Sequence, residues 1–351
     1  MEGVRGKLKM TKYMEAIGFT KHLPISQADS LVAFELPMPS PEAHDLLVQV
    51  TGISVNPVDV GVRQSGSAVL AQPKVIGWDA VGTVVKTGAD VTLFQPGDRV
   101  FYAGSFKRPG SNSAYQLVDE RIVGHAPQKL SDAQAAAIPL TALTAWEGLF
   151  EQLEIDPTAK KRNEQKTILI INGSGGVGSM ATQLAHWAGL KVIASASRPE
   201  TIQWVKAHGA DQTVNHRHDL VQEVKKLGYS YVDYIFELNN LDAHWTEMAR
   251  LIKPGGRIAS ITENRKLVDL KQLTKKRAKF AWEWMFSKSY FQTEDMQSQH
   301  DILEKVAHLL DSGQLVTTMT QTFSPINVAN LKKAHAIVES NHEIGKVTLT
   351  N

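Results

Sequence analysis

A glycine-rich turn in the middle of the chain joins an apolar run to a helix-like stretch. Its residues are Gly173, Ser174, Gly175, Gly176, Val177 and Gly178. Glycines allow positive φ and a close backbone approach to a ligand, and the free N–H groups at the start of a helix attract phosphate. The strand-like run 167–171 precedes the turn, and a second strand-like run, 191–194, follows the helix. This order is typical of a dinucleotide site, so we expect the turn to hold the pyrophosphate of a nicotinamide dinucleotide.

The residues after the second strand-like run indicate which dinucleotide is bound. An NAD site usually carries an acidic residue here, whose carboxylate accepts a hydrogen bond from the ribose 2′-hydroxyl. This chain has Ser195, Ser197 and Arg198 instead. These side chains can donate to a 2′-phosphate, which a carboxylate would repel. We therefore predict NADP(H) as the cofactor; the alternative is that Arg198 is only a solvated surface residue.

Length, charge and cysteine content narrow the class of protein. The 351 residues favour two domains, and a net charge of +2 argues against a nucleic-acid or membrane partner. Five basic residues in 271–279 are interpreted as a solvated helix face. Residues 1–12 are basic and lack an apolar segment, so we expect an extension, with Met14 as an alternative start, on a cytoplasmic protein. The absence of cysteine excludes disulfides and thiolate chemistry.

The order of apolar runs predicts an α/β protein with two different sheets. Short strand-like runs between Pro, Gly and Asp favour an antiparallel, barrel-like domain first: 46–50, 81–85, 99–102 and 115–118. Ser131 is a predicted helix N-cap, and a following helix carries Thr141, Thr144 and Trp146. Strand-like and helix-like runs then alternate from 167 to 261, which predicts a mostly parallel sheet. The chain closes with helices over 301–310 and 329–339 and a strand over 346–349.

Several motifs resemble the medium-chain dehydrogenase/reductases over nearly the whole chain. Residues 77–82 stand where zinc alcohol dehydrogenases of that family have a Gly-His-Glu motif, and 95–100 look like its characteristic turn. Residues 56–59 resemble the quinone oxidoreductase branch, whereas 282–286 with 291–293 resemble a bacterial subgroup labelled zinc-type alcohol dehydrogenase-like.

The resemblance implies the architecture of the chain. It implies a GroES-like β-barrel catalytic domain over 1–132 and 291–351, plus a Rossmann domain with a doubly wound parallel sheet over 133–290. It also implies that the substrate lies between the two domains and that the protein is a homodimer joined at the edge of the Rossmann sheet.

The metal ligands of the zinc enzymes are missing from these motifs. Trp78 replaces the expected histidine, an indole cannot ligate a metal, and no thiolate exists in the chain. His216 and His218 lack a third ligand at a plausible spacing and are interpreted as surface residues. We expect no zinc at either the catalytic or the structural position. Without a cation, quinones and α,β-unsaturated carbonyls are the favoured hydride acceptors, because the charge that develops on them is delocalised.

The resemblance also implies where the catalytic contacts lie. Asn56 and Asp59 match the quinone-reductase pattern beside the nicotinamide, and Arg63 could add a hydrogen-bond donor to the substrate pocket. The residues themselves leave a second interpretation open, in which Pro57 starts a turn and Asp59 pairs with Arg63. Gly61 replaces a tyrosine of many quinone reductases, so a tyrosine-assisted mechanism is not expected.

Other residues are assigned by the same resemblance. Thr144 is expected to contact the carboxamide or ribose of the nicotinamide half, and Thr141 to cap its helix. Trp78 is expected to line the substrate pocket or to pack in the core, and Asp79 to pair with a buried cation. Phe286 is placed in the substrate pocket, within an aromatic group that suits either a flat substrate or ordinary packing: Trp282, Trp284, Phe286 and Phe291. His216 and Lys346 are expected to contact the cofactor.

The sequence predicts an NADPH-dependent reductase of quinones or enones that works without a metal. Two alternatives remain open. One is a zinc-dependent alcohol dehydrogenase with non-standard ligands, and the other is a non-catalytic NADPH-binding sensor.

Overall fold

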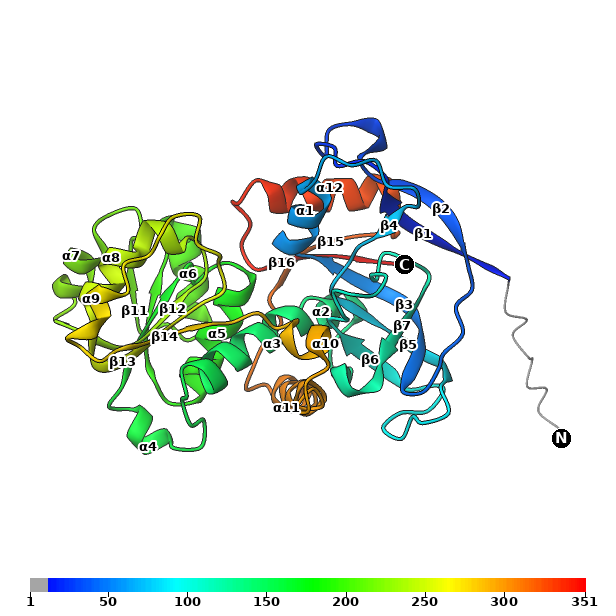
Figure 1. Cartoon of the computed structure of the whole chain (residues 1–351). Helices are drawn as coiled ribbons and strands as arrows, with labels where there is room; N and C mark the ends of the chain where they lie inside the picture. Colours follow the sequence, from blue (N-terminus) through cyan, green and yellow to red (C-terminus); the bar gives the residue numbers. More distant parts are fainter. Residues whose placement is uncertain (1–11) are drawn as a thin grey trace.

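A computed structural model describes residues 12–351, and its sheets form two lobes joined by helices (Figure 1). Residues 1–11, which hold most of the expected N-terminal extension, lie outside the described part. Met14 is buried in the first strand, where it pairs with Leu36. Within residues 12–351, no helix is long and apolar enough to cross a membrane.

The first lobe, which we call the antiparallel lobe, is built around one long strand. Its strands are β1 (Tyr13–Phe19), β2 (Val32–Pro37), β3 (Asp45–Val55), β4 (Lys74–Val75), β5 (Ala80–Thr87), β6 (Arg99–Tyr102), β7 (Tyr115–Asp119), β8 (Val123–His125), β15 (Met319–Phe323) and β16 (Lys346–Thr350). Its helices are η1 (Ala28–Ser30), α1 (Pro57–Gln64), η2 (Glu120–Ile122) and α12 (Val328–Glu339).

Strand β3 pairs with β5 along one edge and with β7 and then β16 along the other, with two register shifts along its pairing with β5. Such irregularities bend a strand, and the bend produces the barrel-like curvature. The strand pairs of this lobe are antiparallel, apart from the parallel pair β15–β16. The antiparallel, barrel-like sheet expected for the first part of the chain is confirmed.

The second lobe, which we call the parallel lobe, is a six-stranded sheet covered by helices. Its elements are β9 (Thr167–Ile171), α5 (Gly176–Trp187), β10 (Lys191–Ser195), α6 (Pro199–Ala207), β11 (Gln212–Val214), α7 (Leu220–Lys226), β12 (Val232–Glu237), α8 (Leu241–Leu251), β13 (Ile252–Ser260), α9 (Lys271–Thr274) and β14 (Lys279–Trp282). All neighbouring strands are parallel, in the order β11-β10-β9-β12-β13-β14. This is the doubly wound order, and its switch point lies between β9 and β12, where ligands of such sheets bind.

The two lobes are joined by a group of helices in the middle of Figure 1. They are α2 (Asp132–Ala136), α3 (Pro139–Trp146), the π-helix η3 (Glu147–Gln152), α10 (Ser287–Phe291) and α11 (Ser298–Asp311); α4 (Lys160–Asn163) leads into β9. Ser131 caps α2 as expected, because its side chain accepts from the N–H of Gln134. Helix α2 packs on the antiparallel lobe, α3 packs on α5, and α11 returns to β8 and η2. The domain limits at 132/133 and 290/291 remain predictions.

The basic run 271–279 is not the single helix face that the sequence suggested. Helix α9 ends at Thr274, and Lys279 already starts strand β14. The Lys276 ammonium donates to the carbonyls of Ala249, Arg250 and Ile252, at the end of α8. The last carbonyls of a helix lack hydrogen-bond partners within the helix, and a lysine ammonium that donates to them stabilises the end of the helix. That contact explains why the run folds back instead of continuing as a helix.

Candidate active site

The glycine-rich turn connects β9 to α5 at the carboxyl edge of the parallel sheet. We expected glycines at positive φ, but that expectation was wrong: the left-handed residue is Asn172, with φ 70°, and none of the four glycines of the turn is among the positive-φ residues. The glycines are needed for close approach instead. A Cβ on Gly178 would overlap the carbonyl oxygen of Asn172, and one on Gly173 would lie 2.8 Å from the Cβ of Ala194. The start of α5 thus stays open as a cradle of backbone N–H groups.

The antiparallel lobe also contributes to this turn. The N–H of Gly345 donates to the carbonyl oxygen of Ser174 at 2.9 Å. A Cβ on Gly176 would lie 2.8 Å from Cδ of Lys346 and 3.2 Å from Cγ2 of Thr141. Lys346 therefore lies against the turn, as its expected cofactor contact requires, and both lobes meet there.

Ser195 does not face a ligand space, in contrast to our expectation. Its side chain is fully buried, and its hydroxyl accepts from the N–H of Asn172 at 2.7 Å and lies 3.1 Å from Nδ1 of His216. Its carbonyl also accepts from the N–H of Gly173. Ser195 and His216 thus support the turn from behind, because a 2′-phosphate could not reach the buried hydroxyl. Burial lowers the pKa of His216, which favours the neutral imidazole there.

Ser197 and Arg198 lie at the entrance to α6, where both are partly exposed. Within residues 12–351, Arg198 is held by Glu200, at 2.8 Å from Nε, and donates from Nη2 to the carbonyl oxygen of His342 at 2.9 Å. A guanidinium that is 27% exposed and has one carboxylate partner remains able to contact a phosphate.

A buried group of four side chains, which we call the polar cluster, lies where α1, the loop before β5 and the start of β16 meet: Asn56, Asp59, Asp79 and Lys346. Asn56 donates from Nδ2 to Asp79 at 2.8 Å and accepts from the Lys346 ammonium at 2.5 Å. Lys346 also donates to the carbonyl oxygen of Val55 and lies 3.5 Å from Asp79. The expected pairing of Asp79 with a buried cation is confirmed, and the cation is Lys346.

Both carboxyl groups of the polar cluster bind protons more tightly than usual. Burial raises the pKa of Asp59 to about 7 and the pKa of Asp79 to about 6, although the Lys346 charge lowers both. Asp59 accepts from the N–H of Asn56 with one oxygen, at 2.8 Å. Its other oxygen is buried and has no hydrogen-bond partner within residues 12–351. A carboxyl group in this state holds a proton near neutral pH.

The raised pKa of Asp59 makes stability depend on pH. An acid with a raised folded pKa stabilises the fold at low pH, and that contribution is lost as pH rises from about 4 towards about 7. We expect the wild type to lose stability relative to Asp59→Asn over that window, by about 1.4 kcal/mol for each pH unit between the unfolded and the folded pKa. Urea unfolding of both proteins between pH 4 and pH 8 measures this, and parallel curves would contradict the assignment.

Arg63 does not belong to the polar cluster. The expected ion pair with Asp59 does not form: the fully buried guanidinium pairs with Glu339 of α12 and donates to the carbonyl oxygen of Leu23. Arg63 lies in the last turn of α1 and Asp59 in its first. The structure therefore gives Arg63 a role in fastening α1 to α12 and not in contacting a substrate.

Trp78 begins a group of rings, which we call the aromatic cluster: Trp78, Phe106, Trp284 and Phe286. The Trp78 indole is 1% exposed and stacks on Phe106, with centroids 5.0 Å apart and planes at 13°. Phe286 is also buried and lies 5.9 Å from Trp78. Trp284 lies 5.8 Å from both Phe106 and Phe286 and is 42% exposed. The expected larger group is divided, because Trp282 packs on Phe280.

The hydroxyls of Thr141 and Thr144 both donate to carbonyls within their own helix region. Thr144 donates to Leu140 at 2.7 Å, and Thr141 donates to Ile138 at 3.0 Å. The capping role expected for Thr141 is wrong, since α3 begins at Pro139 and has no side-chain cap. The Thr144 oxygen can still accept a hydrogen bond, as from a carboxamide.

The histidines do not form a metal site. His218 is an exposed residue 3.7 Å from Glu223, while His216 contacts Ser195. In the part of the chain that the structure describes, no three residues of the ligating types converge on one point.

Sequence reasoning missed a largely buried group beside the aromatic cluster, which we call the acidic cluster: Glu147, Glu151, Glu283, Lys288 and Gln299. All but the exposed Glu151 are buried. Burial raises the pKa of Glu147 and raises that of Glu283 well above its usual value, which favours a protonated carboxyl in the pair. Gln299 donates to Glu147 at 2.9 Å and to the carbonyl of Met285 at 2.6 Å. Lys288 is held by Glu151 at 2.7 Å. These contacts fix the segment 283–288, which carries Trp284 and Phe286.

Glu237 is a second residue that the sequence did not reveal. It ends β12, beside the switch point, and is fully buried. Its carboxylate accepts from the N–H groups of Asn239 and Asn240 and from the hydroxyls of Ser260 and Thr262. The two loops after β12 and β13 are therefore tied together at the edge of the sheet where a dinucleotide would lie.

Removal of the Glu237 carboxylate should loosen this edge. In Glu237→Ala, four donors lose their acceptor. A donor left buried without a partner, such as the Ser260 hydroxyl, costs about 1–3 kcal/mol. We expect a large loss of thermal stability and weaker NADPH binding. Glu237→Gln should lose less, because its amide oxygen still accepts two bonds. Unfolding curves and NADPH titrations test this, and equal effects of the two substitutions would contradict it.

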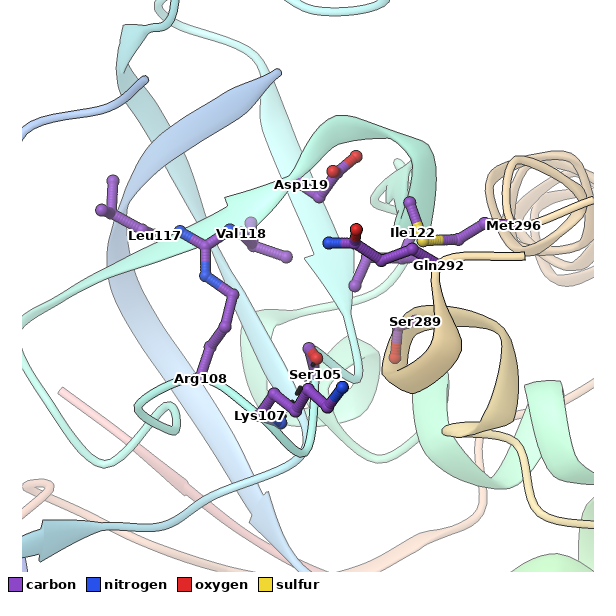
Figure 2. Close-up of a pocket in the computed structure, with 10 residues that line it drawn as sticks. All are labelled: Ser105, Lys107, Arg108, Leu117, Val118, Asp119, Ile122, Ser289, Gln292 and Met296. Atoms are coloured by element: carbon purple, nitrogen blue, oxygen red, sulfur yellow. Dashed lines mark hydrogen bonds between the residues drawn. The ribbon is translucent and has the colours of Figure 1, made fainter. Parts of the chain in front are cut away.

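A small polar cavity of about 70 Å³ lies beside the aromatic cluster (Figure 2). Figure 2 shows Ser105 and Lys107 on one side and Ser289 and Gln292 on the other, with Asp119 above them. A water molecule takes about 30 Å³ of liquid volume, so the cavity holds a few waters. Ligand pockets usually measure several hundred Å³. This cavity is too small for a substrate, and no ring of the aromatic cluster lines it.

Comparisons with known proteins agree with this geometry. A family model described as alcohol dehydrogenase GroES-like domain matches residues 42–131, and one described as zinc-binding dehydrogenase matches residues 176–300. A zinc-type alcohol dehydrogenase-like protein of Staphylococcus aureus (strain MSSA476) is 44% identical over 336 residues, covering 96% of this chain and 99% of that protein.

Two solved structures share the whole architecture. A protein of Rhizobium etli CFN 42, named as a zinc-dependent alcohol dehydrogenase, is 46% identical with a TM-score of 0.91, over 97% of this chain and 99% of that one. The quinone oxidoreductase of Coxiella burnetii is 25% identical with a TM-score of 0.77, over 97% of this chain and 100% of that one.

Proposed function

The chain belongs to the medium-chain dehydrogenase/reductase superfamily of oxidoreductases, and we propose that it uses NADP(H) to reduce a quinone or an α,β-unsaturated carbonyl without a metal. The observation that carries this proposal is the polar cluster. A lysine ammonium, an asparagine amide and two carboxyl groups occupy the region where a metal-dependent relative would need ligands.

The glycine turn supports a dinucleotide cofactor. The start of α5 is open because Gly176 and Gly178 have no Cβ, and Lys346 adds a positive charge beside it. Ser197 and Arg198 would hold the adenosine 2′-phosphate, and no carboxylate of the 195–198 segment opposes it. Ser195 and His216 act indirectly, since they hold the turn in place.

The donor set does not suit a catalytic zinc. Such a site needs three ligands from Cys, His or carboxylate around an open position. Here Trp78 and Asn56 are not ligands of that kind, and Asp79 is already engaged by Leu140, Asn56 and Lys346. A bound cation next to the Lys346 ammonium would also be repelled.

The reaction then follows from charge. When bound, NADPH supplies the hydride, and with one proton the conjugated acceptor becomes its saturated or hydroquinone product. The enolate or phenolate charge that develops is spread over several atoms, so hydrogen-bond donors suffice to stabilise it. We assign Asn56 and Thr144 to the nicotinamide side of the site. Asp59, which holds a proton near neutral pH, keeps the cluster from carrying excess negative charge.

The assembly and the cellular setting are part of the same proposal. Strand β14 pairs only with β13 among the described residues and leaves one sheet edge open, which suits pairing with a second copy. We infer a cytoplasmic homodimer whose partner is a small conjugated molecule, with no nucleic acid or membrane. Sedimentation of the purified protein tests the dimer.

Matched acceptors test the activity. NADPH oxidation is followed with 1,4-benzoquinone, oct-3-en-2-one and its saturated analogue octan-2-one, each with and without a chelator, and again with NADH. We expect the quinone and the enone to be reduced at least about 100-fold faster than the ketone, a difference of roughly 2.7 kcal/mol. Chelator should have no effect, and NADPH should be preferred over NADH. Arg198→Ala should narrow that cofactor preference.

The names of two similar proteins favour one competing function, a zinc-dependent alcohol dehydrogenase. Preference for octan-2-one together with loss of activity in chelator would establish it and refute our proposal. If the protein binds NADPH tightly and no acceptor oxidises the bound NADPH, the protein would instead be a non-catalytic NADPH-binding sensor.

A further inference from the structure

We propose that the acceptor carries an aromatic ring and that Trp284 is the residue that selects it, an inference that rests on the proposed function. The aromatic cluster begins next to the polar cluster. Asn56 donates from Nδ2 to the carbonyl oxygen of Trp78 at 3.3 Å, and Asp79 follows Trp78 in the chain. The backbone of Trp78 therefore contacts the polar cluster, and its ring is the first of the aromatic cluster.

The cluster joins the two lobes. Trp78 and Phe106 belong to the antiparallel lobe, whereas Trp284 and Phe286 follow β14 of the parallel lobe. Phe106 contacts rings from both sides, at 5.5 Å to Phe286 and 5.8 Å to Trp284. Rings from two lobes that meet beside a reaction centre form a continuous apolar surface.

Trp284 is the most exposed member of the cluster, and Phe106 is partly buried. Trp78 and Phe286 are 1% and 2% exposed, so they form the buried base, but Trp284 is 42% exposed. Part of its large apolar indole is therefore open to contact from outside the protein. Its ring contacts the buried cluster and also Tyr290, at 5.4 Å, and the exposed part of the indole is suited to contact a planar ligand.

The backbone that carries Trp284 is held firmly. Gln299 fixes the carbonyl of Met285, and the N–H of Glu283 donates to the carbonyl of Ser260. A side chain that selects a ligand by shape requires such support. An indole on a mobile loop would lose conformational entropy when the ligand binds, and this loss would weaken binding.

Trp282 provides a matched control. It lies two residues earlier, is 45% exposed, and packs on Phe280 instead of on the aromatic cluster. Replacing either tryptophan removes one half-exposed indole from the same segment. An effect restricted to Trp284 therefore cannot come from loss of surface area alone.

The test compares 4-phenylbut-3-en-2-one with oct-3-en-2-one, which share the reacting enone and differ in the ring. For the wild type we expect kcat/KM to favour the phenyl enone. Trp284→Leu should reduce this ratio about tenfold, as stacking contacts of this kind are worth up to about 1.5 kcal/mol. Trp284→Phe should retain most of it, and Trp282→Leu should leave it unchanged. Equal losses for both enones, or equal effects of the two leucine substitutions, would overturn the proposal.

Binding separates this inference from the proposed function. The saturated ketones 4-phenylbutan-2-one and octan-2-one are titrated by calorimetry in the presence of NADP⁺. Weaker binding of the phenyl ketone alone in Trp284→Leu supports the aromatic contact even if no enone is reduced, in which case only the proposed reaction fails. Equal affinity of wild type and Trp284→Leu for the phenyl ketone refutes the aromatic contact, whatever the activity.

Discussion

Gly178→Ala is expected to abolish NADPH binding, with a rise in Kd of at least about 100-fold, or roughly 2.7 kcal/mol. The added methyl would overlap the carbonyl oxygen of Asn172 and crowd Gly173, and both neighbours are backbone that cannot rotate away. The start of α5 would have to move from the end of β9, and its N–H groups would no longer converge on a phosphate. Titration of intrinsic fluorescence with NADPH measures the change.

Gly61→Ala is the matched control, since it places the same methyl in another helix. No atom lies within 4 Å of the Cβ that would be added there. An alanine inside a helix is more favourable than glycine by about 0.5–1 kcal/mol, so the control should be slightly more stable and bind NADPH normally. Normal NADPH affinity in a folded Gly178→Ala protein would show that the turn is not the pyrophosphate site.

The second large effect is expected from Lys346→Met. The substitution leaves the Asp79 carboxyl, the Asn56 amide oxygen and the Val55 carbonyl without their buried donor. Breaking a buried pair from one side costs about 3–5 kcal/mol. Because Lys346 also lies against the glycine turn, NADPH affinity and turnover should fall with stability. Urea unfolding and NADPH titration are the measurements.

A second substitution distinguishes the effect of leaving a buried charge unpaired from the effect of losing the packing of the Lys346 side chain. Lys346→Met combined with Asp79→Asn removes both partners, so it should be less destabilised than the two single substitutions added together. Lys225→Met, on the exposed end of α7, controls for loss of a positive charge and should change little. Strict additivity of the pair would contradict the coupling seen in the structure.

The elements that the sequence predicted well are those whose buried apolar residues form a continuous run or recur at a regular spacing. Strand β9 is buried along its whole length, and helix α8 has the limits that were expected, because each pattern reflects one face or one core. The glycine turn was found because its composition has a direct steric meaning. What its glycines do, however, depends on the Asn172 carbonyl and on Lys346, which a linear pattern does not show.

The parts that were not predicted depend on partners far away in the chain. Asp79 was expected to meet a cation, but only the fold shows that β16 brings Lys346 to it. Arg63 was assigned to Asp59 by proximity in sequence, whereas α12 offers Glu339. Lysines that appeared to line a helix include Lys276, whose ammonium completes the end of α8. In each case the interaction that forms gives a buried polar group its hydrogen-bond partner. Which groups become buried is known only from the folded structure.

The position of the transferred hydride tests the central claim most directly. Reduction of oct-3-en-2-one with NADPH carrying deuterium at the transferable position of nicotinamide C4 can be analysed by NMR of the product. A conjugated acceptor used without a metal should yield octan-2-one with deuterium on the β-carbon. An unsaturated alcohol with deuterium on its carbinol carbon would contradict the account if chelator stops its formation.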